Sequence, residues 1–160
     1  MTVAAALLLN VLLALTWAAA TGELTLGSLV LGFAVSYAIL AFAEPVIGAS
    51  GYFVKAPRML RLTALFLWEL VVASLRVAHD VATPTHYSRP GVIAVPLEAT
   101  TEVEITVLAN LISLTPGTLS LDVSPDRRVL YIHAMFADDP DAVRRQIKDG
   151  FERRLLEVLR

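Results

Sequence analysis

The carboxyl group best placed for chemistry in this sequence is that of Glu69, which lies deep in the apolar stretch 59–81. An ionisable group at membrane depth is by default a functional residue, and Glu69 would then supply a carboxylate to an ion path. Two other interpretations stay open. Glu69 can form a salt bridge to Arg76 or to a partner protein, or it can lie exposed at the membrane interface.

Other residue types that bind ions or activate nucleophiles have unsuitable spacings. The three histidines are scattered, and the absence of cysteine excludes disulfides and thiolate chemistry. The acidic run 138–141 suggests a cation site, but carboxylates also stabilise helix N-termini, which is the simpler interpretation. No nucleophile–base pair and no Gly-Lys-Ser/Thr phosphate loop occurs. We therefore expect no catalytic residue, no cofactor and no metal.

The composition indicates that lipid solvates part of the chain. Hydrophobic residues make up 56% of the 160 residues and the mean hydropathy is +0.66, which exceeds the values of ordinary soluble domains. The net charge is only −2, so no strong field points to nucleic acid as a partner.

The excess of apolar residues lies in the first part of the chain. Residues 3–20 and 24–43 carry no charge, and each run is about as long as the ~20 residues that cross a bilayer as a helix. The short break between them predicts a tight hairpin, so we assign two transmembrane helices to residues 1–43. A cleaved signal peptide ending near residue 20 is the alternative, but no Lys or Arg precedes Lys55 to form its basic region.

Small residues recur every fourth position in the second span, at Ser28, Gly32 and Ser36. Helix backbones approach closely along such a face, and packing of this kind drives helix association in lipid. We predict a helix-packing face there. The alternative is that membrane helices are simply rich in small residues.

Charge between the elements predicts the topology. The loop between the spans carries only Glu23, whereas Lys55, Arg58 and Arg61 follow the second span. The positive-inside rule places this basic segment, and with it the N-terminus, in the cytoplasm.

Residues 44–90 are expected to hold a basic loop, a helix over 59–81 and a linker rich in proline and glycine. At about 100° per residue, the charged side chains of this helix fall within a stripe that includes Glu69 and Arg76. The helix is either an interfacial helix with its apolar face in lipid, which we favour, or a third span whose polar stripe meets a partner.

The remainder, 91–160, is predicted to be a cytoplasmic α+β domain with the order β-α-β-β-α. Thr101 and Glu104 form a capping box that opens a helix, although 102–107 also alternates as a strand would. Asp139 and Pro140 suit the start of the last helix, whose basic face meets either solvent, a partner or anionic lipid. The fold class is thus a membrane α-helical hairpin plus an amphipathic helix, followed by a small α+β domain.

Between these elements stands the run 114–123, which contains Thr115, Pro116, Gly117 and Thr118. The Pro-Gly pair ends one helix, and the alternating residues 118–123 that follow predict a half-buried strand, which we expect to be central in the sheet. A hairpin partner is expected over 129–136, after a turn at 124–127.

The Leu-Thr-Pro-Gly-Thr-Leu sequence at 114–119, the strand sequence Val-Leu-Tyr-Ile-His at 129–133 and the two preceding spans resemble the E subunit of the Mrp-type (Mnh or Pha) multisubunit cation/proton antiporters. The resemblance covers essentially the whole chain. It implies a hetero-oligomeric complex in the bacterial plasma membrane that exchanges Na⁺ for H⁺, with the transport machinery in other, larger subunits. Thr115–Thr118 would then be a structural family motif.

The chain itself agrees with an accessory role, because its spans lack the Lys and Asp/Glu relays of a self-sufficient antiporter. We therefore expect an accessory subunit that supports assembly or activity, in contact with the bilayer and with other subunits. The alternatives are a stand-alone membrane adaptor that recruits a soluble protein, and a small homo-oligomeric transporter, which the ion-poor spans disfavour.

Overall fold

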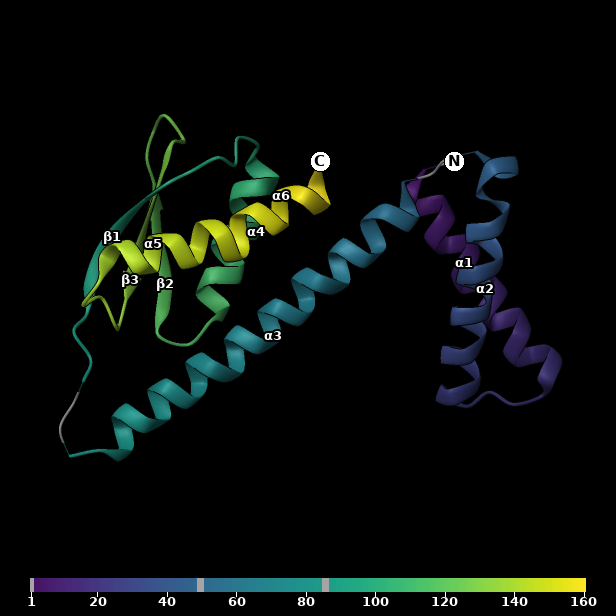
Figure 1. Ribbon diagram of the computed structural model, residues 1–160, viewed down its shortest axis with the longest axis horizontal. Helices are drawn as coiled ribbons and strands as arrows, with labels where there is room; N and C mark the ends of the chain where they lie inside the picture. Colours follow the sequence, from purple (N-terminus) through teal and green to yellow (C-terminus); the bar gives the residue numbers. More distant parts are fainter. Residues whose placement is uncertain (1, 49–50, 85–86) are drawn as a thin grey trace. The chain divides into compact units, whose positions relative to one another are not determined.

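The computed structural model describes residues 2–48, 51–84 and 87–160, and it divides into two units, Met1–Pro57 and Arg58–Arg160. The first unit contains α1 (Val3–Thr21), α2 (Leu26–Ile47) and the start of α3 (Tyr52–Ala82). The second contains the rest of α3 and the elements that follow it (Figure 1).

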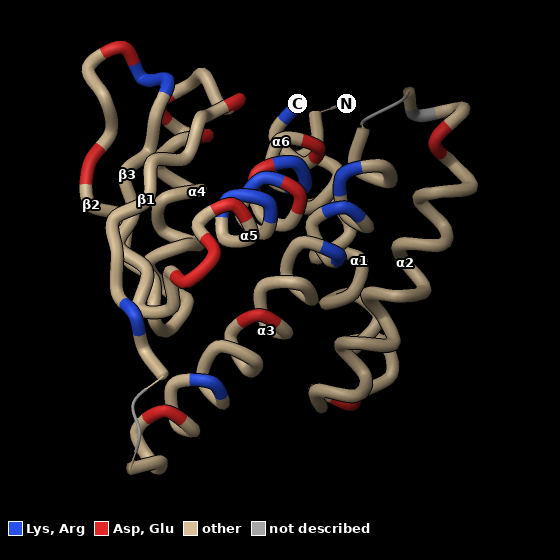
Figure 2. Tube along the Cα trace, turned by 60° about the vertical axis from the view of Figure 1, so that its left-hand side comes forward, with Lys and Arg blue, Asp and Glu red and all other residues tan. Residues whose placement is uncertain are grey.

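Two capped helices form the hairpin of the first unit. The Thr2 hydroxyl accepts from the amide of Ala5 at 3.2 Å, and the Thr25 hydroxyl accepts from the amide of Ser28 at 3.2 Å, so each helix begins at an N-cap. Gly22 ends α1 with φ of 72°, a left-handed conformation that glycine adopts without strain. Both helices are long and apolar enough to cross a membrane, and Figure 2 shows them almost free of charged residues.

The boundaries near residue 50 differ from the prediction. α2 continues through Pro45 to Ile47, and Lys55 and Arg58 lie within α3, where a basic loop was expected. Proline normally interrupts a helix, and Pro57 lies inside this one. Aromatic packing stabilises the start of α3, which lies before the predicted start at residue 59. Tyr52 and Phe53 contact the Tyr37 ring edge-on at centroid distances of 5.6 and 5.0 Å.

The second unit holds a three-stranded antiparallel sheet of β1 (Gly91–Pro96), β2 (Thr118–Val123) and β3 (Val129–Ala134) in the order β1-β3-β2. The central strand is therefore β3 and not β2. The reason is topological: β3 returns from β2 as a hairpin and also pairs with β1, so that β1, α4 (Glu102–Leu114) and β2 form a β-α-β unit split by β3.

Strand β2 is half-buried as predicted, but its leucines lie on the exposed side. Leu119 and Leu121 are 49% and 50% exposed. The inner side carries hydroxyl groups that bind α4: Thr118 donates to the carbonyl of Ile112 at 2.7 Å, and Ser120 donates to that of Ala109 at 3.0 Å. These hydrogen bonds satisfy the inward polar groups, so alternation alone did not identify the buried face.

Helix α4 has the predicted capping box, in which Thr101 and Glu104 satisfy each other's backbone amides. Together with the C-terminal helices it covers the sheet face that carries Ile93, Val95, Leu130 and Ile132 (Figure 1). The core of the second unit lies in this layer.

The predicted last helix is three consecutive segments: α5 (Pro140–Arg145), the π-helix η1 (Gln146–Glu152) and α6 (Arg153–Leu159). Asp139 caps it with Pro140 at the first position, as predicted. Its apolar residues Val143, Ile147, Phe151 and Leu155 recur every fourth position, a spacing that rotates by about 40° per step in a regular α-helix. The wider π-turns reduce this rotation and keep the apolar face on the sheet.

Candidate functional site

The Thr115–Thr118 motif forms the turn between α4 and β2, and its polar groups are used within the turn. The Thr115 hydroxyl donates to the carbonyl of Leu111 at 3.0 Å, and the Thr118 hydroxyl donates to that of Ile112 at 2.7 Å. The amide of Met135 closes the turn on the carbonyl of Gly117 at 2.7 Å. The two hydroxyl groups of the motif and the Gly117 carbonyl are therefore engaged in hydrogen bonds within the fold.

Gly117 also sets the contact between this turn and α3. Its φ of 85° lies in the left-handed region, and a Cβ atom there would lie 3.6 Å from both Met135 and Val77. A Cβ atom at this position would make ordinary van der Waals contacts, so the cost of a side chain there is the strain of the positive φ.

The structure separates Glu69 and Arg76, which the sequence offered as an ion pair. The Glu69 carboxylate accepts from the Gln146 side chain at 2.7 Å, and the Arg76 guanidinium lies 5.9 Å from the centre of the Phe136 ring. Both residues of α3 thus contact other elements of their own unit, Glu69 through η1 and Arg76 through the segment after β3.

Two buried glutamates join the loop after β1 to the C-terminal helices. The Glu152 side chain is 2% exposed and accepts from the amides of Glu98 and Ala99 at 2.6 and 2.9 Å, with Lys148 at 3.3 Å. Glu104 accepts from the amide of Thr100 and from the Arg160 guanidinium at 2.8 and 2.9 Å. Sequence reasoning identified Glu104 through its capping box, but Glu152 lacked any local signal.

The hydrogen bond from Arg160, with those from Thr100 and Thr101, lowers the pKa of Glu104 to about 2 from 4.5. Because the folded-state pKa lies below the unfolded value, this carboxylate stabilises the fold above about pH 4.5 and loses that effect as the pH falls toward 2. Glu104→Gln keeps an oxygen for the capping box but removes the charge. We expect the variant to unfold with a shallower pH dependence between about pH 5 and 2, as followed by circular dichroism on the full chain.

Glu102→Gln is the matched control for that acid titration. Glu102 pairs with Arg127 at 2.8 Å, but both side chains are more than half exposed, so the pair contributes little. An unchanged pH slope for Glu104→Gln, equal to that of the control, would contradict the assignment.

The small residues predicted as a packing face lie along the side of α2 that meets α1. A Cβ atom on Gly32 would lie 3.0 Å from the carbonyl oxygen of Ala14 and from the Trp17 ring. Ser36 is buried, and the Ser28 hydroxyl lies 3.4 Å from that of Thr21.

Sequence reasoning missed the matching stripe on α1. It consists of residues that recur every fourth position and are at most 5% exposed: Ala6, Asn10, Ala14 and Ala18. Their regular spacing was the available signal, and alanine-rich composition hid it. The Asn10 amide donates to the Tyr52 hydroxyl at 3.0 Å, so this stripe also fixes the start of α3.

Gly32→Leu should open the hairpin. The added side chain meets the α1 backbone, and overpacking of this kind costs about 1–3 kcal/mol. Gly27→Leu is the control in the same helix, because a Cβ atom there meets only the Thr25 hydroxyl, at 3.9 Å. We expect a lower thermal midpoint in micelles for Gly32→Leu alone, and equal midpoints would argue against close packing at Gly32.

The described part of the second unit exposes apolar residues on two of its surfaces. One is the open face of the sheet, where Val92, Leu119, Leu121 and Tyr131 are between 39% and 65% exposed. The other is the side of α3 that faces away from the sheet. Apolar patches of this kind mark contacts with proteins or membranes.

The acidic run 138–141 is engaged in the fold. Asp139 caps α5, whereas Asp138 pairs with Arg89 at 3.3 Å and Asp141 pairs with Arg144. Within residues 2–48, 51–84 and 87–160, no group of three or more His, Cys, Asp or Glu side chains is placed to hold a metal ion.

Known proteins of one family are similar to almost the whole chain. Residues 10–158 match the family described as "Na+/H+ ion antiporter subunit". The chain is 36% identical over 152 residues to the E subunit of the Na(+)/H(+) antiporter of Alkalihalophilus pseudofirmus, in an alignment that covers 95% of this chain and 96% of that protein.

Two solved structures are also similar. A chain of the membrane-bound sulfane sulfur reductase, an archaeal respiratory membrane complex, is 26% identical with a TM-score of 0.51, over 94% of this chain and 96% of that one. A chain of the Mrp complex from Dietzia sp. DQ12-45-1b is 30% identical with a TM-score of 0.49, over 64% of this chain and 96% of that one.

Proposed function

Because the chain belongs to the Na⁺/H⁺ antiporter subunit family, we propose that it is an accessory E-type subunit that supports assembly or activity of the complex without transporting ions alone. The chain is a component of a multisubunit membrane antiporter, and its partners are other subunits of that complex.

The observation that carries the accessory role is the charge content of the two spans. α1 has no Asp, Glu, Lys, Arg or His, and α2 has only Glu44, close to its end. Ion and proton paths through membranes need ionisable side chains, which face the interior of a bundle or a water-filled cavity. The apolar hairpin supports anchoring and packing instead.

Reconstitution tests whether the chain transports ions by itself. The full chain alone in proteoliposomes is expected to give no Na⁺-driven proton movement, whereas the complete complex exchanges the two ions. A complex assembled without the chain should lose activity or fall apart. Antiport by the chain alone would refute the accessory role.

Glu69→Gln is the sharpest variant within this test. Since the Glu69 carboxylate binds Gln146 of its own unit, removing its charge should leave antiport by the complex within about twofold of the unsubstituted level. A loss of transport with the complex still assembled would place Glu69 on the ion path.

We further propose that the C-terminal unit and the N-terminus are cytoplasmic. The support is the asymmetry between Glu23, in the loop between the spans, and the basic residues Lys55, Arg58 and Arg61. Because the chain lacks cysteine, Glu23→Cys and Asn110→Cys each introduce a single label site. An impermeant maleimide should reach position 23 only from outside the cell and position 110 only from inside; the reverse pattern would invert the topology.

A further inference from the structure

Helix α3 has a charged side and an apolar side. The charged side contacts the rest of the unit and the apolar side is exposed, whereas a helix on a water-soluble protein is arranged the other way round. Over residues 58–82, Arg58, Glu69, Arg76 and Asp80 contact the rest of their own unit, whereas Arg61 is exposed. Arg58 donates to the carbonyl of Glu157 at 2.8 Å, and the Asp80 carboxylate accepts from the amides of Tyr87 and Ser88. With Glu69 and Arg76 bound as described above, this side of α3 faces the sheet and the C-terminal helices of its own unit.

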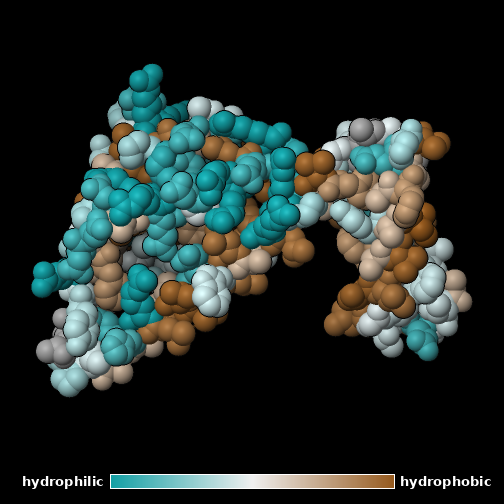
Figure 3. Space-filling view, in the orientation of Figure 1, coloured by the Kyte–Doolittle hydropathy of each residue, from teal (hydrophilic) through white to brown (hydrophobic). Residues whose placement is uncertain are grey.

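The outward face of α3 is apolar along its length. Its large residues are between 51% and 71% exposed, and they are Leu60, Leu67, Trp68, Val71, Leu75 and Val81. At about 100° per residue, Arg61 falls at the border of this face, next to Trp68, and the other charged side chains fall on the opposite side of the helix. Figure 3 shows hydrophobic side chains along the edge of the unit that α3 forms. A helix facing water would bury this side and expose the other.

Chain connectivity places the start of α3 near the bilayer. α2 ends at Ile47 and α3 begins at Tyr52, so the connection can reach at most about 18 Å from the end of the span. Residues 59–81 then extend for about 33 Å as helix. The outward face is therefore continuous in sequence with a membrane span.

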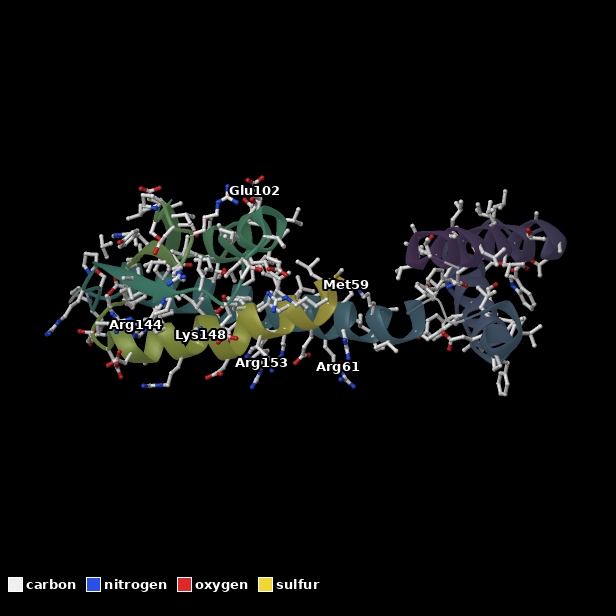
Figure 4. All side chains as sticks on the ribbon, turned by 90° about the horizontal axis from the view of Figure 1, so that it is seen from above. Met59, Arg61, Glu102, Arg144, Lys148 and Arg153 are labelled. Atoms are coloured by element: carbon white, nitrogen blue, oxygen red, sulfur yellow. The ribbon has the colours of Figure 1, made fainter. Side chains whose placement is uncertain are left out.

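Basic side chains flank this face. Arg61 of α3 and Arg153 of α6 are both exposed, and Figure 4 shows them pointing to the same side of the unit. Apolar residues that include tryptophan on one face, with arginines beside them, are the pattern of a helix that lies in the membrane interface. Arginines at that depth attract anionic headgroups.

We propose that α3 lies along the cytoplasmic surface of the bilayer, with Leu60, Leu67, Trp68, Val71 and Leu75 in the boundary between headgroups and acyl chains. Arg61 and Arg153 bind anionic phospholipid headgroups. The sheet and C-terminal helices then rest on the membrane through α3, which uses the membrane setting of the chain but does not depend on its accessory role.

Quenching of Trp68 fluorescence by brominated lipids measures this directly. The chain has two tryptophans, so the full chain and Trp68→Phe are compared in nanodiscs, and the difference isolates Trp68 from Trp17. We expect bromine near the headgroup end of the acyl chain to reduce Trp68 emission about twofold, and bromine near the chain terminus to have less effect. No quenching of Trp68, or stronger quenching by deep bromine, would overturn the interfacial position.

The dependence of Trp68 quenching on lipid charge tests whether Arg61 and Arg153 bind anionic headgroups. In nanodiscs of phosphatidylcholine, added phosphatidylglycerol should increase the quenching of Trp68, and the double variant Arg61→Gln/Arg153→Gln should abolish that increase. Arg128→Gln, another exposed arginine of the same unit, should leave it unchanged. A double variant that responds like the control would refute the headgroup contact.

Photo-crosslinking in native membranes separates lipid from a partner subunit. With benzoylphenylalanine at position 67 or 71 of the tagged full chain, we expect adducts whose added mass is that of a phospholipid. A predominant crosslink to another protein would show that a subunit covers this face, and would overturn the proposal while leaving membership of the complex intact.

Discussion

Glu152→Ala is expected to lower the free energy of unfolding of the second unit by several kcal/mol, because two amides lose their acceptor and each buried donor left unsatisfied costs about 1–3 kcal/mol. The side chain is 2% exposed and accepts from the amides of Glu98 and Ala99. Alanine would leave these two N–H groups without an acceptor and would remove one of the two carboxylates that pair with Lys148, the other being Glu98 at 3.0 Å. The loop between β1 and α4 would then be held to η1 by Lys148, which binds Glu98 and the carbonyl of Pro96.

Hydrogen-exchange mass spectrometry on the full chain in nanodiscs measures the effect segment by segment. Peptides from β1, α4 and the C-terminal helices should exchange faster in Glu152→Ala, while α1 and α2 keep their protection. Glu157→Ala is the control on α6, because that side chain is exposed, and its effect should stay within about 0.5 kcal/mol. Equal protection in the two variants would contradict a structural role for the buried carboxylate.

Leu62→Ala should be almost as damaging, with a loss of about 2–5 kcal/mol, because the truncation leaves a cavity in the core. Leu62 is 5% exposed and belongs to the core cluster of the second unit, where Leu65 and Phe66 of α3 also pack. Loss of this contact should release α3 from the sheet and helices that cover its polar stripe.

Leu114 of α4 provides the comparison within the same unit, because it does not lie on the outward face of α3. It is 63% exposed, so Leu114→Ala should change the stability of the unit by no more than about 0.5 kcal/mol. Thermal unfolding in nanodiscs distinguishes the two, since each kcal/mol shifts the midpoint of a domain of this size by about 4–8 °C. Similar midpoints for both variants would mean that α3 does not pack through Leu62.

Local signals predicted most of the elements. The capping box at Thr101 and Glu104, the N-cap at Asp139 and the Pro-Gly stop at 116–117 each involve residues a few positions apart, so their physics can be read from the sequence. The two spans could be predicted for a similar reason, since length and apolarity decide whether a helix crosses a bilayer.

Features that depend on distant contacts could not be predicted in this way. The leucines of β2 lie outward because hydroxyl groups of Thr118 and Ser120 bind the α4 backbone, a pairing that alternation does not reveal. The π-turns at Gln146–Glu152 follow from keeping an every-fourth-residue apolar face on the sheet. Glu152 itself is bound to a loop more than 50 residues away.

The residues of the candidate site likewise differ in whether the sequence alone could identify them. The stripe at Ser28, Gly32 and Ser36 was visible in sequence, whereas its alanine-rich counterpart on α1 was not. Glu69 was singled out because it is ionisable in an apolar stretch, but its partner Gln146 lies in the last helical run. The sequence could therefore identify Glu69 as unusual, but only the structure shows that Gln146 binds it.

Co-purification from native membranes tests the central claim most directly. An affinity tag on the full chain, with gentle detergent extraction, should recover the chain in fixed stoichiometry with large subunits that cross the membrane many times. Recovery of the chain by itself, or with soluble proteins only, would contradict its assignment as an accessory subunit of the antiporter.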